Sequence, residues 1–235
     1  MSDVDRTTSP EPSGCIVAFG DGAVLLSLGD RVDAALAERA QAIAAGIDAV
    51  RADEPRLGRA VPAHASVLVP FDPLAIGLDA VTAIVRACAD RALVDAGGAE
   101  DRAATRQPLE LTVRYGGADG PDLEEVAALH DLRPADVVEL HAGATYHVLF
   151  LGFAPGFAYL GGLPASLVTP RKATPRPRVP AGSVGIAGEQ TGVYPLAMPG
   201  GWQLIGRTEA RLWDHARPSP ALLRPGDLVR FVPAR

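Results

Sequence analysis

The sequence contains few cysteines and no long apolar run. Among its 235 residues, Cys15 and Cys88 lie too far apart to form a metal-binding spacing, and their apolar surroundings lead us to expect two buried free thiols. No apolar run approaches the length needed to span a bilayer. Residues 1–13 are polar and lack the basic start and apolar middle of a signal peptide, so we expect a disordered tail. These features indicate a cytoplasmic protein without a membrane partner.

Acidic residues outnumber basic residues, and lysine is nearly absent. The formal net charge is −6, and Lys172 is the only lysine. General nucleic-acid binding needs a basic face that displaces counterions, so we expect no nucleic-acid partner. The sequence has no P-loop, no Gly-x-Ser-x-Gly elbow and no histidines at metal-ligand spacing, so we expect no metal site. His130 and His141 fall in or beside short helices, where we expect them at the surface.

Apolar residues make up 48% of the sequence, which is enough to bury a core. In the first half, short apolar strands are interleaved with two stretches of helical periodicity. The expected strands cover residues 16–19, 23–28, 57–61 and 66–69. Asp30 can cap the first helix, which includes Val32 to Val50, and the second includes Val81 to Ala92. This order predicts a split βαβ domain over residues 14–103, with its helices on one face of the sheet.

The second half, residues 104–235, is dense in glycine and proline. Residues 109–115 alternate between apolar and polar side chains, as a half-buried strand does, and two short helices are expected to follow. Further strands are expected at residues 146–151, 183–187, 202–207 and 227–232. Many short strands separated by Gly/Pro turns favour a barrel or a sandwich, so the expected fold class is α+β.

The glycine-rich stretch 152–162, GFAPGFAYLGG, is the first of three motifs that can carry chemistry. Glycine allows close backbone approach and positive φ, while proline stiffens the turn. Phe157 and Tyr159 could form a flat wall for a ligand. The alternative is a barrel corner plugged by Phe153 and Phe157.

The second motif is a basic segment, 170–180, in which prolines hold the chain extended. It contains Arg171, Lys172, Arg176 and Arg178. Fixed guanidinium groups suit carboxylate or phosphate, which they can grip with two hydrogen bonds. The alternative is a solvated basic loop.

The third motif runs from Gly188 to Trp202. Gln190 and Thr191 offer neutral donors and acceptors that can hold an amide or an oxyanion, and Gly200-Gly201 can bring backbone N–H groups to an anion. The alternative is a hairpin with Trp202 in the core.

Taken together, the three motifs resemble one protein family. Its pattern is roughly GFxPGFxYLGGL, then TPRxxxPRxxVPAGSVxIAGxQTGxYP, then PGGWxLIGRT, and every part is present here. The family contains the B-type subunit of 5-oxoprolinase, allophanate hydrolase subunit 1 and the Kip-type sporulation-kinase inhibitor. The resemblance covers nearly the whole chain beyond the tail. Met198 departs from the pattern, in which a small hydroxyl residue precedes Pro-Gly-Gly-Trp.

This resemblance implies a fold, an activity and partners. The fold would be an N-terminal α/β domain followed by a cyclophilin-like β-barrel. The activity would be ATP-dependent hydrolysis of 5-oxo-L-proline to L-glutamate. It would be shared with a homologue of allophanate hydrolase subunit 2, which is the C-type subunit of the enzyme, and with a LamB/YcsF-type protein, its A-type subunit. One alternative is a urea-carboxylase-like or allophanate-related carboxyltransferase subunit, which would use biotin. Another is a regulatory inhibitor of a histidine kinase.

Side-chain chemistry then suggests roles within this small-molecule reaction. An activated lactam needs cations for phosphate and carboxylate, together with neutral donors for the amide. The expected catalytic residues are Arg178, Gln190 and Thr191. The expected substrate-binding residues are Phe157, Tyr159, Arg176, Tyr194, Gly200, Gly201 and Arg207.

Overall fold

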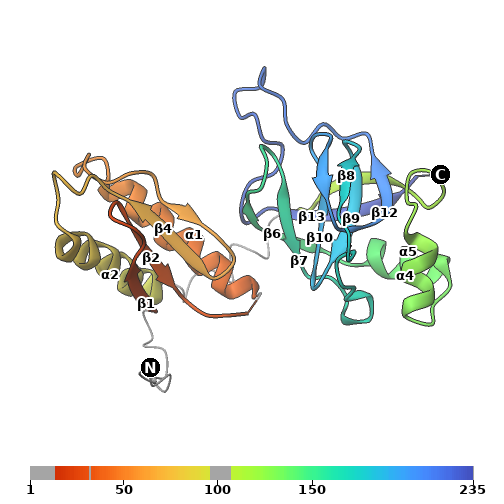
Figure 1. The fold of residues 1–235 in the computed structure, drawn as a ribbon, viewed down its shortest axis with the longest axis horizontal. Helices are drawn as coiled ribbons and strands as arrows, with labels where there is room; N and C mark the ends of the chain where they lie inside the picture. The colour runs from red at the N-terminus through yellow and green to blue at the C-terminus, as the bar shows by residue number, and fades with distance from the viewer. Residues whose placement is uncertain (1–13, 32, 96–106, 235) are drawn as a thin grey trace. The chain divides into compact units, whose positions relative to one another are not determined.

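The computed structural model describes residues 14–31, 33–95 and 107–234, and the chain divides into two compact units at residues 102 and 103 (Figure 1). The expected tail, the expected domain boundary at 103–104 and Val32 lie outside the described residues. Within the described ranges, no helix has both the length and the apolar character needed to cross a membrane.

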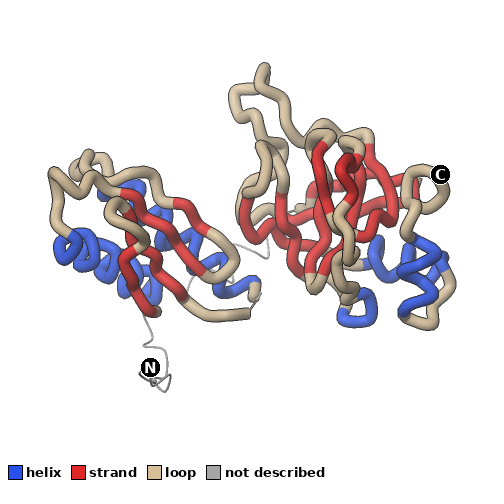
Figure 2. Tube along the Cα trace, in the orientation of Figure 1, coloured by secondary structure: helices blue, strands red, loops and turns tan. Residues whose placement is uncertain are grey.

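The N-terminal unit is an antiparallel sheet with two helices on one of its faces (Figures 1 and 2). Its elements are β1 (Cys15–Ala18), β2 (Ala23–Ser27), α1 (Ala34–Val50), β3 (Val61–Pro62), β4 (Ser66–Pro70) and α2 (Leu78–Asp95). The sheet order is β1-β2-β4-β3. Alternate strand residues, such as Val24 and Val67, are buried against Ile43, Ile47 and Val85 of the helices. The expected helices on one sheet face are confirmed.

Three expectations for this unit are wrong in detail. The cap of α1 is Asp33, whose carboxylate accepts hydrogen bonds from the amides of Ala35 and Leu36, whereas Asp30 lies before the cap. The strand expected at 57–61 shortens to β3. Cys15 is exposed because it occupies an outward position on edge strand β1, while Cys88 is a buried free thiol.

The C-terminal unit is a closed barrel of seven strands with two short helices packed against it (Figure 1). The barrel strands are β5 (Leu109–Tyr115), β6 (Tyr146–Leu151), β7 (Ala158–Gly161), β9 (Ser183–Ala187), β10 (Gln190–Val193), β12 (Gln203–Thr208) and β13 (Leu228–Pro233). Helices α4 (Leu123–Leu129) and α5 (Pro134–Gly143) contact β12 and β13, and η2 (Ala165–Leu167) follows β7. This confirms the α+β class and the preference for a barrel.

A separate two-stranded ribbon, β8 (Arg176–Val179) paired with β11 (Met198–Gly200), lies outside the barrel sheet. On β12, Ile205 faces the barrel interior and Leu204 faces outward, into a second cluster with Trp202 and Val179. The ribbon therefore covers the outer face of the barrel. The basic segment and the Pro-Gly-Gly-Trp segment, which are distant in sequence, form its two strands.

Candidate functional site

The aromatic residues of the first and third motifs pack together beneath the ribbon. The rings of Phe157 and Trp202 have centroids 5.5 Å apart, and those of Phe157 and Tyr194 are 5.3 Å apart. Phe157 and Tyr194 are each 1% exposed. A Cβ at Gly200 would overlap the hydroxyl of Tyr194, so a glycine is needed for the ribbon to approach this closely. These residues form a small core, which favours the packing alternative for Phe157 and Tyr194.

Tyr159 lies at the edge of this cluster and is half-buried. Its ring stacks on Phe150 with centroids 4.3 Å apart. Burial raises the pKa of Tyr159 and of Tyr194, and the positive charge of Arg171 partly offsets both shifts. This effect of its charge shows that Arg171, which is exposed, lies near both phenols.

The basic segment is anchored by one buried carboxylate, Asp122, which is 3% exposed. One of its oxygens accepts hydrogen bonds from Arg176 Nη2 at 2.6 Å and Lys172 Nζ at 3.1 Å, and the other accepts from the amide of Leu204 at 2.6 Å. Burial by itself would raise the pKa of Asp122, but these hydrogen bonds outweigh burial and lower the pKa. Arg176 therefore ties the ribbon to α4. Arg178, in contrast, is exposed on the ribbon.

Thr191 is completely buried in the barrel, beside His141 of α5. Its hydroxyl donates to the carbonyl of Gly185 at 3.0 Å and accepts from His141 Nε2 at 2.9 Å. His141 Nδ1 in turn accepts from the hydroxyl of Tyr115 at 2.7 Å. These contacts use both hydrogen-bonding roles of the Thr191 hydroxyl, so its placement favours a structural role.

The expected surface position of His141 is wrong, because α5 turns this side chain inward to stack on Phe231, with ring centroids 4.7 Å apart. Burial lowers the pKa of His141 to about 3, so the ring is neutral. His130 is only partly exposed and its Nε2 pairs with the hydroxyl of Thr169 at 2.9 Å.

Two of the expected catalytic residues lie in different sheets, Arg178 on the ribbon strand β8 and Gln190 on the barrel strand β10. Arg178 precedes strand β9, and Gln190 follows the hairpin turn at its other end.

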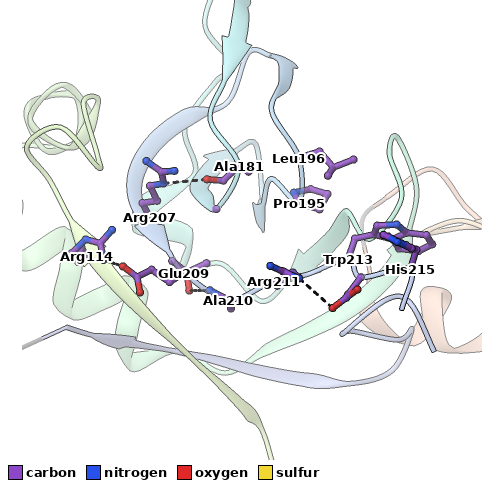
Figure 3. A pocket seen from close by; sticks show the side chains of 13 residues that line it. Arg114, Ala181, Pro195, Leu196, Arg207, Glu209, Ala210, Arg211, Trp213 and His215 are labelled. Atoms are coloured by element: carbon purple, nitrogen blue, oxygen red, sulfur yellow. Dashed lines mark hydrogen bonds and ion pairs between the residues drawn. The ribbon is translucent and has the colours of Figure 1, made fainter. Parts of the chain in front are cut away.

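Arg207 lines a surface pocket of about 620 Å³ beside the barrel, shown in Figure 3. Its Nε donates to the carbonyl of Ala181 at 3.1 Å. The pocket walls come from β5, β12, the residues around Gly182 and Pro195, and the loop after β12. The lining residues are Arg114, Ala181, Gly182, Pro195, Leu196, Arg207, Thr208, Glu209, Ala210, Arg211, Trp213, Asp214 and His215.

Of the ten expected site residues, seven lie under, within or directly beside the ribbon, and Arg207 lies in the separate pocket. The seven are Phe157, Tyr159, Arg176, Arg178, Tyr194, Gly200 and Gly201. Sequence reasoning missed Asp122, whose position in the chain indicates only a helix cap, and it missed Trp213 and His215. Asp122 is about fifty residues away from its partner Arg176 in the chain, and Trp213 and His215 follow Arg207 closely without forming a recognisable motif with it.

Comparison with known proteins gives a consistent result over nearly the whole chain. Residues 15–223 match the family model described as carboxyltransferase domain, subdomain C and D. The chain is 48% identical to the B-type subunit of 5-oxoprolinase from Escherichia coli O157:H7, over 92% of this chain and 94% of that protein. It is 41% identical to the B-type subunit of 5-oxoprolinase from Bacillus subtilis (strain 168), over 92% of this chain and 91% of that protein. The crystal structure of TTHA0988 is 38% identical with a TM-score of 0.76, covering 91% of this chain and 40% of that longer chain.

Proposed function

This chain belongs to the carboxyltransferase domain, subdomain C and D, family, and from that membership we propose that it is the B-type subunit of a 5-oxoprolinase. The observation that carries the proposal is the match to two 5-oxoprolinase subunits of this type, at 41% and 48% identity and over more than nine-tenths of each chain. Such a match extends to both units, and so it includes the ribbon, the aromatic cluster and the pocket. The activity belongs to a multi-subunit enzyme.

The proposed reaction opens a lactam ring. Water adds to the amide carbon, the C–N bond breaks, and the ring nitrogen becomes the amine of glutamate. Amide resonance makes this step slow, so we propose that the complex couples it to hydrolysis of ATP to ADP and phosphate. Among the described residues we find no glycine-rich loop opening a helix that could cradle phosphates, so no step through ATP is assigned to this chain.

A partner for this chain is the second part of the proposal. We propose that the C-type subunit, a homologue of allophanate hydrolase subunit 2, binds this chain, and that a LamB/YcsF-type protein, the A-type subunit, completes a cytoplasmic complex supplied with ATP. In TTHA0988 the part that matches this chain is 40% of one longer polypeptide, so a chain of this kind can be joined covalently to a further segment. The catalytic roles expected for Arg178, Gln190 and Thr191 stay predictions.

The N-terminal unit offers a surface for such a partner. On the sheet face that carries no helix, Val17, Leu25, Leu68 and Val61 are paired in register across all four strands. Val17 is 49% exposed and Val61 is 52% exposed. A face of four strands about 4.8 Å apart and about 15 Å long presents roughly 300 Å². A stable interface needs about 800 Å² per partner, so other surfaces must contribute.

The test is reconstitution of the complex. We expect glutamate to form from 5-oxo-L-proline and ATP when this chain is combined with both the C-type and the A-type subunits, and not when any one of the three is left out. Robust hydrolysis by this chain alone would contradict the shared active site. The family description also favours a second function, carboxyl transfer as half of a biotin-dependent carboxyltransferase. Carboxylation of urea by the same complex with a biotin carboxylase, without turnover of 5-oxoproline, would select that function.

A further inference from the structure

Strand β1 forms one margin of the N-terminal sheet, and no described strand pairs with its outer side (Figure 1). The amide of Phe19, just after β1, donates to the carbonyl of Ala23 on β2 at 2.8 Å. Because hydrogen-bonded positions alternate along an antiparallel pair, Val17 also directs its backbone groups to β2. The N–H and C=O groups of Ile16 and Ala18 therefore point away from the sheet.

This margin lacks the features that keep a sheet edge from pairing with another chain. Residues 15–19 are Cys, Ile, Val, Ala and Phe, with no charge and no proline. Val17 is 49% exposed and Phe19 is 57% exposed, so the strand is accessible. The opposite margin, β3, has two residues, and one of them is Pro62. Proteins block sheet edges with proline, charge or very short strands, so β3 is protected and β1 is open to a further strand.

Helix α2 lies over the same margin of the sheet. It contacts β1 and β2, whereas α1 contacts β3 and β4. A Cβ at Gly46 of α1 would lie 3.8 Å from the Cβ of Cys88, so Cys88 marks the flank of α2 that faces α1. Helical spacing turns Leu78 and Leu93 away from Cys88, toward the flank beyond β1. These leucines are 43% and 37% exposed, so the margin has an apolar strand edge and an apolar helix flank.

A second copy of the chain fits both layers of this margin. An antiparallel pair of β1 strands with its two-fold axis at Val17 sets Ile16 opposite Ala18 of the other copy. Each such pair exchanges two hydrogen bonds, so the outward N–H and C=O groups of both residues are satisfied on both strands. Neighbouring strands are about 4.8 Å apart, so two α2 helices, each above its own β1 and β2, would lie roughly 10 Å apart, close to the spacing of packed helices. An unrelated strand would satisfy the backbone groups but would bring no matching helix flank.

From this geometry we propose that two copies of the chain associate through an antiparallel β1–β1 pair and the adjoining flanks of α2. The pair would join two four-stranded sheets into one continuous sheet with its helices on one face. The proposal goes beyond the proposed function and does not depend on it, because it concerns the chain alone. A strand of 4 residues and one helix flank make a small interface, so we expect a dissociation constant on the order of 10 μM.

Disulfide cross-linking tests the register of the proposed pair. The two Val17 residues would face each other at a position without hydrogen bonds, with Cα atoms about 4.5 Å apart, which suits a disulfide. In a Cys15→Ser background, Val17→Cys should form a covalent dimer under mild oxidation by glutathione. Val61→Cys in the same background is the matched control, because Val61 is 52% exposed on β3 at the opposite margin, and it should form little dimer. Cys88 is buried and is common to both variants.

Analytical ultracentrifugation of the full chain measures the association itself. The wild-type chain should pass from monomer to dimer between about 1 and 300 μM. Val17→Lys places two like charges opposite each other on the axis, so it should raise the dissociation constant about tenfold or more. Val61→Lys makes the same change at the other margin and should leave the dissociation constant unchanged. Thermal melting checks that each variant is folded, and if Val17→Lys does not fold, the cross-linking of Val17→Cys decides.

Three outcomes overturn the proposal: a wild-type chain that stays monomeric over this range, equal disulfide formation by Val17→Cys and Val61→Cys, or equal association of the folded Val17→Lys and Val61→Lys variants. If the wild-type chain is monomeric and Val17→Lys weakens binding of the C-type subunit, the edge of β1 belongs to that subunit and not to a second copy. A reconstituted complex without turnover of 5-oxo-L-proline refutes the proposed function and leaves the dimer to be decided by these measurements.

Discussion

At the scale of single residues, His141 shows how the barrel satisfies a polar group that it buries completely. Thr191 donates to a carbonyl, so it must accept from His141 Nε2–H, and this leaves Nδ1 to accept from Tyr115. Both ring nitrogens are paired, and the hydroxyl of Tyr146 donates to the His141 carbonyl at 2.8 Å. The neutral ring is therefore well accommodated, and a protonated ring is disfavoured because complete burial penalises its charge.

This network predicts a pH dependence of stability. The folded pKa of His141 is about 3 and the unfolded value is 6.5, so only the unfolded state binds a proton between these pH values. The contribution of neutral His141 to the free energy of unfolding is therefore complete above pH 6.5. Below that pH the contribution falls by about 1.4 kcal/mol per pH unit. His141→Gln should remove that slope between pH 6.5 and 5. The measurement is urea unfolding at several pH values, and equal slopes for the two proteins would contradict the assignment.

At the scale of elements, the ribbon depends on contacts far away in the sequence. Arg176 at the start of β8 and Lys172 before it both bind Asp122, at the start of α4, and Lys172 Nζ also contacts Glu125 at 2.9 Å. The amide of Lys172 donates to the carbonyl of Gly201, next to β11. The ion cluster thus joins the start of α4 to the base of the ribbon.

Asp122→Ala should therefore loosen the ribbon and destabilise the C-terminal unit. Removing one partner of a buried ion pair typically costs about 3–5 kcal/mol, because the remaining charge loses its compensation. Asp119→Ala is the matched control, because Asp119 pairs with the half-exposed Arg114. This substitution should lower the free energy of unfolding by about 1 kcal/mol or less. Denaturant unfolding gives both values, and limited proteolysis reports on the ribbon. If Asp122→Ala lowers the free energy of unfolding no more than Asp119→Ala does, the ion cluster does not anchor the ribbon.

At the scale of the whole molecule, the two units present surfaces of different character. The helix-free sheet face of the N-terminal unit carries only apolar and small uncharged side chains in its strands, with Ser27 and Ser66 beside the row centred on Leu25 and Leu68. The barrel unit carries the charged pocket around Arg207. An uncharged surface suits a permanent partner, and a charged pocket suits a small anion.

Leu68→Glu should accordingly weaken binding of the C-type subunit without unfolding the chain. The side chain is half-buried and faces away from the helices, so the monomer can hydrate a carboxylate there. We expect the dissociation constant to rise about tenfold or more. Leu74→Glu, at a loop position that is 97% exposed, is the matched control. Size-exclusion chromatography after co-expression measures the effect, and normal co-elution of the Leu68 variant would remove this face from the interface.

The sequence by itself determined the class of each half and most of the elements. Alternation in Leu109–Tyr115 predicted β5, and helical spacing predicted α1 and α2, because local hydrophobic periodicity records which face of an element is buried. The sequence did not predict the strands β7, β8, β10 and β11. There, glycine and proline lower the local strand signal, and barrel closure and ribbon pairing supply the hydrogen bonds that local sequence does not specify.

Only the tertiary structure decided where each residue of the motifs lies and which contacts it makes. Arg176 and Arg178 are chemically alike and two positions apart, yet one is held by Asp122 and the other is exposed. Gln190 and Thr191 are neighbours, yet the strand alternation of β10 sends Thr191 into the barrel. The partners in these contacts, Asp122 and His141, are about fifty residues away in the chain. The sequence shows which polar groups the protein has. Only the closed barrel determines which of them are paired within the protein and which remain free to bind a ligand.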